Sequence, residues 1–216
     1  MFILDQKNSI GSQFIAELRD INIQKDRMRF RRNLERIGEI MAYEISKTFD
    51  YQPVDVTTPL GIDPSMIAAE RPVLISVLRA GLPFHQGFLN YFDRADSGFI
   101  GAYRKEENAE AANVEVDLSY TGAPSVQDKI LILVDPMLAT GTSLAKAYKN
   151  LIDCNGTPSK VHIVSVIAAQ KGVDKISTEI PGATIWLGAL DGVLNDQFYI
   201  VPGLGDAGDL SFGPKL

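Results

Sequence analysis

The sequence predicts an α/β fold: a doubly wound, mostly parallel sheet with helices on both faces. Short runs that are apolar at successive positions, such as ILILV at 130–134 and VHIVSVIAA at 161–169, are typical of strands buried on both faces. Segments with apolar residues at every third or fourth position, typical of amphipathic helices, separate these runs. Strands and helices that alternate in this way form parallel sheets, because each crossover helix returns the chain to the same edge.

Each element follows from its own pattern. Residues 26–47 have apolar side chains every three to four positions among charged ones, which predicts a long amphipathic helix. The segment 51–64, which contains proline and glycine, predicts an extended arm with a turn, and a short helix is expected at 65–70. Further strands are expected at 72–78, 98–103, 129–134, 160–169 and 183–189, and further helices at 83–92, 143–154 and 173–178. The polar, turn-rich residues 103–129 predict a hairpin or a flap at the edge of the sheet.

Length and composition predict one globular domain over residues 1–216. The chain is 45% hydrophobic and 22% charged, which is ordinary for a domain that buries a core. Within it we expect an N-terminal helix and arm (1–60), the hairpin or flap (103–129) and a C-terminal binding segment (199–216). A net charge of -6 and a pI near 5.0 disfavour general affinity for nucleic acid or anionic membranes, so the expected partners are small molecules.

Cysteine usage and the first residues bear on the compartment. Cys154 is the only cysteine, so no intrachain disulfide can form and a reducing compartment is expected. The first residues lack the basic region and apolar core of a signal peptide, and no apolar run reaches the roughly 18 residues that span a bilayer. The sequence therefore predicts a cytoplasmic protein without a membrane anchor.

The segment DPMLATGTS at 135–143 is the strongest candidate for a binding site. It follows a predicted strand and precedes a helix, so it lies at the carboxyl end of a parallel strand, where ligands bind in doubly wound folds. The backbone N–H groups and hydroxyls of 139–143 can surround a phosphate, and Asp135 can accept hydrogen bonds from sugar hydroxyls, so the segment suits a ribose 5-phosphate. No Gly-Lys-Ser/Thr follows, which excludes a Walker A loop. The alternative is an ordinary turn with Ser143 as a helix N-cap.

Other segments carry groups suited to the rest of such a ligand. Arg79 follows an apolar strand in a short loop before a helix, where a guanidinium can bind diphosphate oxygens with two hydrogen bonds. Arg104, at the end of the strand expected at 98–103, is a second candidate. The glycine-rich segment YIVPGLGDAGD at 199–209 lets the backbone approach a flat pyrimidine closely. The alternative for this segment is a flexible C-terminal tail.

Taken together, these motifs resemble the uracil phosphoribosyltransferases, in that family's order and over most of the chain. They are VLRAG at 77–81, AYRKEE at 102–107, DPMLATGTS at 135–143 and YIVPGLGDAGD at 199–209, and residues 18–46 resemble the leading helices of the family. The resemblance implies the type I phosphoribosyltransferase fold and the reaction of uracil with 5-phospho-α-D-ribose 1-diphosphate (PRPP), giving UMP and diphosphate in pyrimidine salvage. It also implies Mg²⁺ held mainly through the diphosphate, without a dedicated protein ligand.

The resemblance assigns roles by motif. The residues implied in catalysis are Asp135, Arg79, Arg104 and Asp206, with both arginines on diphosphate and Asp206 on the phosphoribosyl substrate or its metal. Ribose and 5′-phosphate would be held by Asp135, Pro136, Met137, Leu138, Ala139, Thr140, Gly141, Thr142 and Ser143. Uracil would be recognised through Ile200, Gly205, Asp206 and Ala207, mainly by backbone groups. Thr142 departs from the family, where glycine is usual.

The resemblance also bears on assembly and regulation. It implies a homodimer or higher homo-oligomer, and GTP is a candidate effector because some family members respond to it. The first predicted helix carries a basic cluster: Lys25, Arg27, Arg29, Arg31, Arg32 and Arg36. A solvated or subunit-interface face is the preferred interpretation of this cluster, and an anion site is the alternative.

Three rival functions stay open at this point. A regulator of the same fold that senses uracil nucleotides and binds RNA would need a basic face. A homologue that binds PRPP without turnover would follow if Thr142 or the 103–129 segment weakened closure over the substrate. Among enzymes, an orotate or purine transferase would differ in its choice of base.

Overall fold

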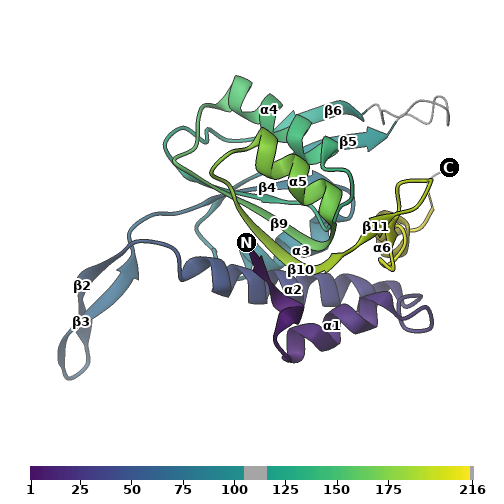
Figure 1. Ribbon diagram of the computed structural model, residues 1–216. Coiled ribbons are helices and arrows are strands. Elements are labelled where there is room, and N and C mark those ends of the chain that lie inside the picture. The colour runs from purple at the N-terminus through teal and green to yellow at the C-terminus, as the bar shows by residue number, and fades with distance from the viewer. Residues whose placement is uncertain (105–115, 215–216) are drawn as a thin grey trace.

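The computed structural model describes residues 1–104 and 116–214, and within them the predicted fold class is confirmed (Figure 1). In spatial order the main strands are β1 (Phe2–Ile3), β10 (Thr184–Asp191), β9 (Lys160–Ala169), β7 (Ile130–Val134), β4 (Val73–Leu78), β5 (Asp96–Arg104) and β6 (Val116–Gly122). Neighbours run parallel except for β6, which pairs antiparallel with β5. The carboxyl ends of the parallel strands therefore meet at one edge of the sheet.

Helices cover both faces of this sheet (Figure 1). On one face lie α4 (Thr142–Asn155) and α5 (Gln170–Glu179), and on the other lie α1 (Ile10–Arg19), α2 (Arg27–Ser46) and α3 (Gly81–Leu89). The side chains of β7 alternate between two buried clusters: Ile130, Ile132 and Val134 join the cluster of α2 and α3, whereas Leu131 and Leu133 join that of α4. Burial on both faces explains why this strand has no polar alternation.

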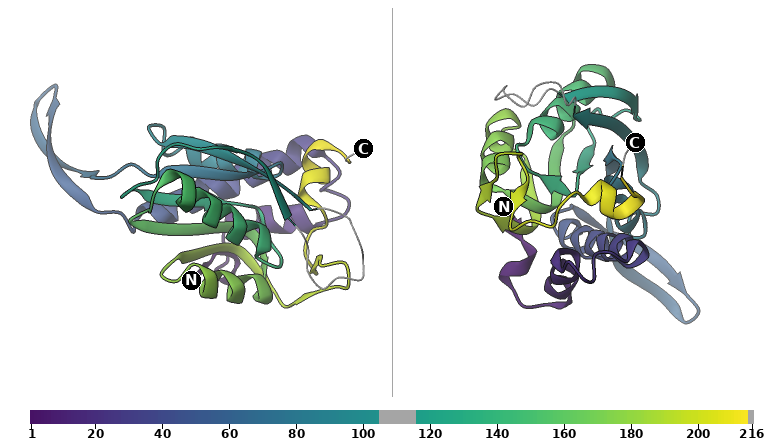
Figure 2. Two further views of the ribbon diagram at one scale, coloured as in Figure 1. Left: turned by 90° about the horizontal axis from the view of Figure 1, so that it is seen from above. Right: turned by 90° about the vertical axis from the view of Figure 1, so that its right-hand side faces the viewer.

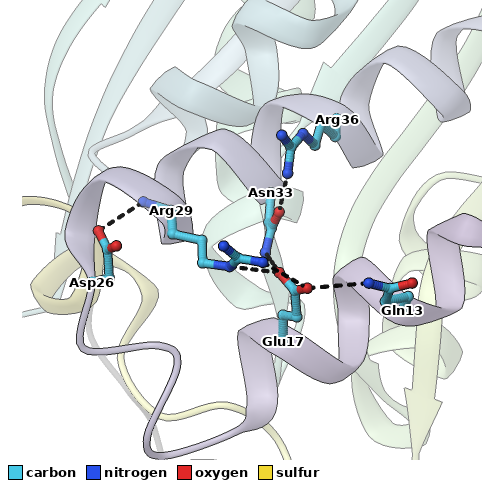
Figure 3. Close-up of polar contacts among 6 residues, drawn as sticks. All are labelled: Gln13, Glu17, Asp26, Arg29, Asn33 and Arg36. Carbon is cyan, nitrogen blue, oxygen red and sulfur yellow. Dashed lines mark hydrogen bonds and ion pairs between the residues drawn. The ribbon is translucent and has the colours of Figure 1, made fainter.

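A polar cluster joins α1 to α2 (Figure 3). The Glu17 carboxylate accepts hydrogen bonds from Arg29 Nε at 2.9 Å, from Arg29 Nη2 at 3.0 Å and from Asn33 Nδ2 at 2.7 Å. Hydrogen bonding from Arg29, supported by Asn33, lowers the pKa of Glu17 to about 2. Helix α2 was expected from the sequence, whereas helix α1 was not. Helix α1 carries this buried acid and places it against α2.

The basic cluster on the predicted first helix is largely engaged within the protein. Arg29 binds Glu17, Arg32 pairs with Glu35 at 2.6 Å, and Arg31 donates to the backbone oxygen of Ser211 at 2.7 Å. These contacts involve half-exposed arginine side chains, and the preferred interpretation of a solvated or subunit-interface face stays a prediction.

The short helix expected at 65–70 is wrong. β2 (Tyr51–Thr58) and β3 (Gly61–Ala68) form an antiparallel hairpin that extends away from the body of the protein (Figure 1). The two strands pair over their whole length, from Tyr51 opposite Ala68 to Thr58 opposite Gly61. The residues that were expected to be helical therefore have a partner strand, which the local sequence does not reveal. Most of the hairpin's side chains are exposed, including Leu60 and Ile62.

The 103–129 segment was expected to form a hairpin or a flap. Its described residues include β6, which forms a hairpin with β5 at the edge of the sheet. The pairing of β5 with β6 shifts register between Gly101 and Ala102. Residues 105–115, the middle of the proposed flap, lie outside the described part of the chain. None of the helices within the described residues is long and apolar enough to cross a membrane.

Candidate active site

The segment after β7 is fixed firmly to its neighbour. β8 (Met137–Leu138) pairs with the end of β9, and the Pro136 oxygen accepts hydrogen bonds from Val166 N and Ile167 N at 3.1 and 3.0 Å. Asp135 Oδ1 accepts a hydrogen bond from Met137 N at 3.2 Å. Because Pro136 and Leu138 are buried, the chain holds the Asp135 carboxylate in place at the carboxyl edge of the sheet.

The loop then turns sharply into α4. Gly141 has φ of 76° and is the N-cap of this helix, so the alternative that Ser143 is the cap is wrong. A Cβ at Gly141 would lie 3.0 Å from the Gly172 oxygen and 3.3 Å from Lys175 Cβ, because α5 passes close by. The first turn of an α-helix has N–H groups without partners in the helix, and they point into the loop where an anion can bind.

Thr142, the residue that departs from the family pattern, fits this backbone. Thr142 is the first residue of α4. Within the loop 135–143 only Gly141 has a positive φ, so position 142 does not require glycine. Thr140 Oγ1 lies 3.2 Å from Thr142 Oγ1 and accepts a hydrogen bond from Thr142 N at 3.4 Å. The two threonines therefore stabilise the loop, and their hydroxyls lie beside its N–H groups.

Arg79 begins the loop between β4 and α3, directly beside the strand that carries Asp135. β4 and β7 are neighbours, with Ser76 opposite Val134, so both loops leave the same edge of the sheet. The Arg79 guanidinium reaches α6 (Ala207–Phe212), where Nη2 donates to Asp209 Oδ1 at 3.0 Å. Arg104 ends β5 at this edge, but its side chain lies outside the described part of the chain.

The C-terminal segment is ordered and anchored, so the alternative of a flexible tail is wrong for its described residues. Ile200 lies in β12 (Ile200–Val201), which pairs antiparallel with β11 (Val193–Leu194). The Asp191 carboxylate accepts hydrogen bonds from Gly203 N and, in bidentate fashion, from Arg19, each at 2.8 Å. Arg19 also donates to the Gly203 oxygen at 3.0 Å. Arg19 and Asp191 therefore hold the turn at Gly203, which lies within the proposed uracil segment.

Of the predicted uracil residues, Ile200 precedes that turn, Gly205 and Asp206 follow it, and Ala207 begins α6. Gly205 has φ of 93°, Asp206 caps α6 by accepting from Asp209 N at 2.9 Å, and Ala207 is buried. Ala139, Ile200 and Ala207 belong to one apolar cluster, which joins the phosphate loop to the C-terminal segment. In Figures 1 and 2, β11 and α6 lie on the side of the protein toward which the β5 arrow points. The structure thus brings the loop 135–143, Arg79 and the C-terminal segment to one edge.

Sequence reasoning missed three residues that position these groups. Arg19, Asp191 and Asp209 bind partners far away in the chain: Arg19 and Asp191 are 172 positions apart, and Arg79 and Asp209 are 130 apart. Asp209 lay within a quoted motif, but nothing local indicated its partner. The other two had no recognisable signal.

A separate hollow lies beside this edge. A cavity of about 490 Å³ is lined by Ala169, Lys171 and residues of the segment between β10 and β12. None of the predicted site residues lines it, and Lys171 Nζ lies 5.7 Å from the centre of the Phe198 ring. It adjoins the uracil segment through the pairing of β11 with β12.

Both histidines are structural. His85 and His162 are buried, and burial lowers the pKa of each to about 4, so both are neutral near pH 7. His162 accepts a hydrogen bond from Trp186 Nε1 at 3.0 Å. Neither belongs to the edge described above.

Comparisons with known proteins show which family the chain belongs to. The uracil phosphoribosyltransferase family matches residues 7–214. A uracil phosphoribosyltransferase of Porphyromonas gingivalis is 50% identical over 214 residues, covering 99% of this chain and 98% of that protein. One from Sulfolobus acidocaldarius is 39% identical, covering 93% of this chain and 94% of its own. The structure of the AQ2163 protein from Aquifex aeolicus superimposes with a TM-score of 0.87 at 31% identity, covering 99% and 98% of the two chains. With this match along the chain and this arrangement of loops, the protein belongs to the uracil phosphoribosyltransferase family.

Proposed function

We propose that this protein transfers the 5-phosphoribosyl group of PRPP to N1 of uracil, giving UMP and diphosphate in pyrimidine salvage. The observation that carries the proposal is the loop 135–143, which presents an acid and then the start of α4 at the carboxyl edge of the sheet. Asp135 would accept hydrogen bonds from the ribose hydroxyls, and the N–H groups and hydroxyls of residues 140–143 would bind the 5′-phosphate.

The chemistry calls for charge stabilisation more than for proton transfer. The reaction breaks the bond between C1′ and the diphosphate oxygen, leaving an oxocarbenium-like ribosyl centre, and forms a bond from C1′ to uracil N1, which releases its proton as diphosphate departs. Arg79, together with Arg104, would stabilise the negative charge on the leaving group. The loop 135–143 would hold the ribose, and the C-terminal segment would hold N1 in line with C1′.

Mg²⁺ fits this site as a partner of the substrate. Within the described residues, no three His, Cys, Asp or Glu side chains are grouped to hold a metal ion. Mg²⁺ commonly binds through one or two carboxylates, waters and substrate phosphates, and Asp135 and Asp206 are the acids at this edge that the resemblance assigns to the phosphoribosyl substrate. When bound with PRPP, the ion would neutralise diphosphate charge.

Uracil recognition is assigned to backbone groups. Gly205 has no side chain to block approach, and the backbone of Ile200, Asp206 and Ala207 offers donors and acceptors that can match the edge of a pyrimidine.

Assembly and regulation complete the proposal. The exposed apolar side chains of the β2–β3 hairpin, such as Leu60, Ile62 and Met66, support a homodimer or higher homo-oligomer. GTP activation rests on the family resemblance alone, since the basic residues of α2 largely have protein partners. A single exposed cysteine, Cys154, supports a cytoplasmic location.

The proposal is tested by base selection. Purified protein with Mg²⁺ and PRPP is given uracil, orotate, hypoxanthine or no base, with and without GTP, and diphosphate release is measured. We expect release only with uracil. Release with orotate or hypoxanthine instead would contradict the assignment of the C-terminal segment. PRPP binding without release for any base would indicate the silent homologue, and retention of RNA at moderate salt would favour the regulator.

A further inference from the structure

The guanidinium of Arg79 is held by an acid that the roles above leave out. Nη2 donates to Asp209 Oδ1 at 3.0 Å, and Nη1 lies 3.5 Å from the Gly213 oxygen. Asp209 is in the first turn of α6, so the ion pair joins the loop after β4 to the C-terminal helix. Arg31 of α2 fixes the other end of α6 through the Ser211 oxygen.

Gly208 lies beside this ion pair, whose side chains are 36% and 42% exposed. A Cβ at Gly208 would lie 3.4 Å from Arg79 Nη2, 3.8 Å from Arg79 Nε and 3.0 Å from Asp206 Oδ1. Asp206 in turn accepts a hydrogen bond from Asp209 N. Arg79, Asp206 and Asp209 therefore form one connected group around a glycine that allows the guanidinium to approach.

The ion pair with Asp209 uses only one of the three guanidinium nitrogens of Arg79. Asp209 binds Nη2 only, whereas Nε is buried and has no hydrogen-bond partner within the described residues. An arginine has five N–H donors, so one nitrogen can bind a carboxylate while others bind phosphate oxygens. If Asp209 blocked the binding of diphosphate to Arg79, we would expect its carboxylate to accept a hydrogen bond from Nε as well as from Nη2.

We infer that Asp209 is a positioning residue for diphosphate binding: it fixes the Arg79 guanidinium through Nη2 at the edge where the diphosphate of PRPP is proposed to bind. The inference rests on the proposed function and deepens it. It also gives a physical connection between diphosphate and base, because the segment that positions Arg79 is continuous with the residues assigned to uracil.

The test is direct binding of PRPP with Mg²⁺ and no base, measured by titration calorimetry. Asp209→Asn keeps the shape and removes the charge, and we expect it to raise the Kd about threefold to tenfold, which corresponds to about 0.6 to 1.4 kcal/mol. Asp209→Glu should restore binding to within about twofold of wild type. The matched control, Asp93→Asn, changes an exposed acid at the opposite edge of the sheet and should bind normally. In steady state, Asp209→Asn should raise KM for PRPP more than it lowers kcat.

A double-mutant cycle shows whether Asp209 acts through Arg79. In an Arg79→Lys background, Asp209→Asn should have little further effect, because the geometry it supports is already lost. Equal or tighter binding of PRPP by Asp209→Asn would overturn the inference, and so would an undiminished loss in the Arg79→Lys background. A wild-type protein that binds PRPP but forms no UMP would contradict the proposed function while leaving this test readable. Failure of the wild type to bind PRPP would contradict both.

Discussion

Replacing Gly141 with alanine tests whether the loop between β7 and α4 is both strained and functional. Gly141 has φ of 76°, and an added Cβ would lie 3.0 Å from the backbone oxygen of Gly172. Gly182 offers a matched control: its φ is 86°, but nothing lies within 4 Å of its Cβ position. Gly182→Ala therefore reports the backbone term alone, at a turn away from the loop.

The expected magnitudes follow from these two environments. A left-handed φ costs an alanine about 1–2 kcal/mol, so Gly182→Ala should lower the free energy of unfolding by about that much. Gly141→Ala must also displace backbone in α5 by a few tenths of an ångström, and a total loss of about 2–3 kcal/mol is expected. The shift moves the N–H groups of the loop, so KM for PRPP should rise about tenfold in Gly141→Ala only.

Urea unfolding measures the first quantity and steady-state kinetics at saturating uracil measure the second. The reasoning would be refuted by equal stability losses in the two variants together with an unchanged KM for PRPP in Gly141→Ala. An equal rise of KM in Gly182→Ala would show that the kinetic effect is not specific to the loop.

Four further outcomes are expected. Asp135→Asn should lower kcat/KM at least about tenfold while leaving the unfolding midpoint unchanged, because it removes only the charge that binds the ribose hydroxyls; unchanged kinetics would remove Asp135 from the site. Thr142→Gly should alter KM for PRPP by less than about threefold, because the position is already helical, and a large gain in activity would show that threonine obstructs the loop. The folded-state pKa of Glu17 is about 2, below its ordinary 4.5, so its stabilisation is present above pH 4.5 and is lost as pH falls toward 2; acid unfolding of Glu17→Gln should lack this component. The pKa values of His85 and His162 fall from 6.5 to about 4 on folding, so the free energy of unfolding should decline as the pH falls from 6.5 toward 4. At pH 5 the expected loss is about 2 kcal/mol per histidine. Equal free energies of urea unfolding at pH 7.5 and pH 5 would contradict this expectation.

The fold could be predicted because its elements have strong local signals. The strand β7 is apolar at every position and is covered on both faces, which makes its burial visible in the sequence. The hairpin β2–β3 was only half predicted, since its second strand depends on pairing with Tyr51–Thr58 and carries residues that also suit a helix. Helix α1 was missed because its buried acid, Glu17, interrupts the apolar face and has its partner on another helix.

The site divides in the same way. The strand–loop–helix geometry of 130–155 could be predicted because strand, acid, glycine and helix follow one another within a few residues, whereas its binding of phosphate stays a prediction. The helix expected at 143–154 begins one residue earlier, at Thr142, and its N-cap is Gly141, whose positive φ does not show in the periodic pattern of the helix. The partners of Arg79 and Asp191 could not be predicted, because long-range ion pairs leave no periodic pattern.

The measurement that tests the central claim most directly is UMP formation by the purified protein from uracil and PRPP with Mg²⁺, followed by chromatography alongside diphosphate. The account predicts that UMP and diphosphate appear in equal amounts, that both depend on uracil, and that Asp135→Asn loses most of both. Diphosphate without UMP, or UMP formation that survives Asp135→Asn unchanged, would contradict it.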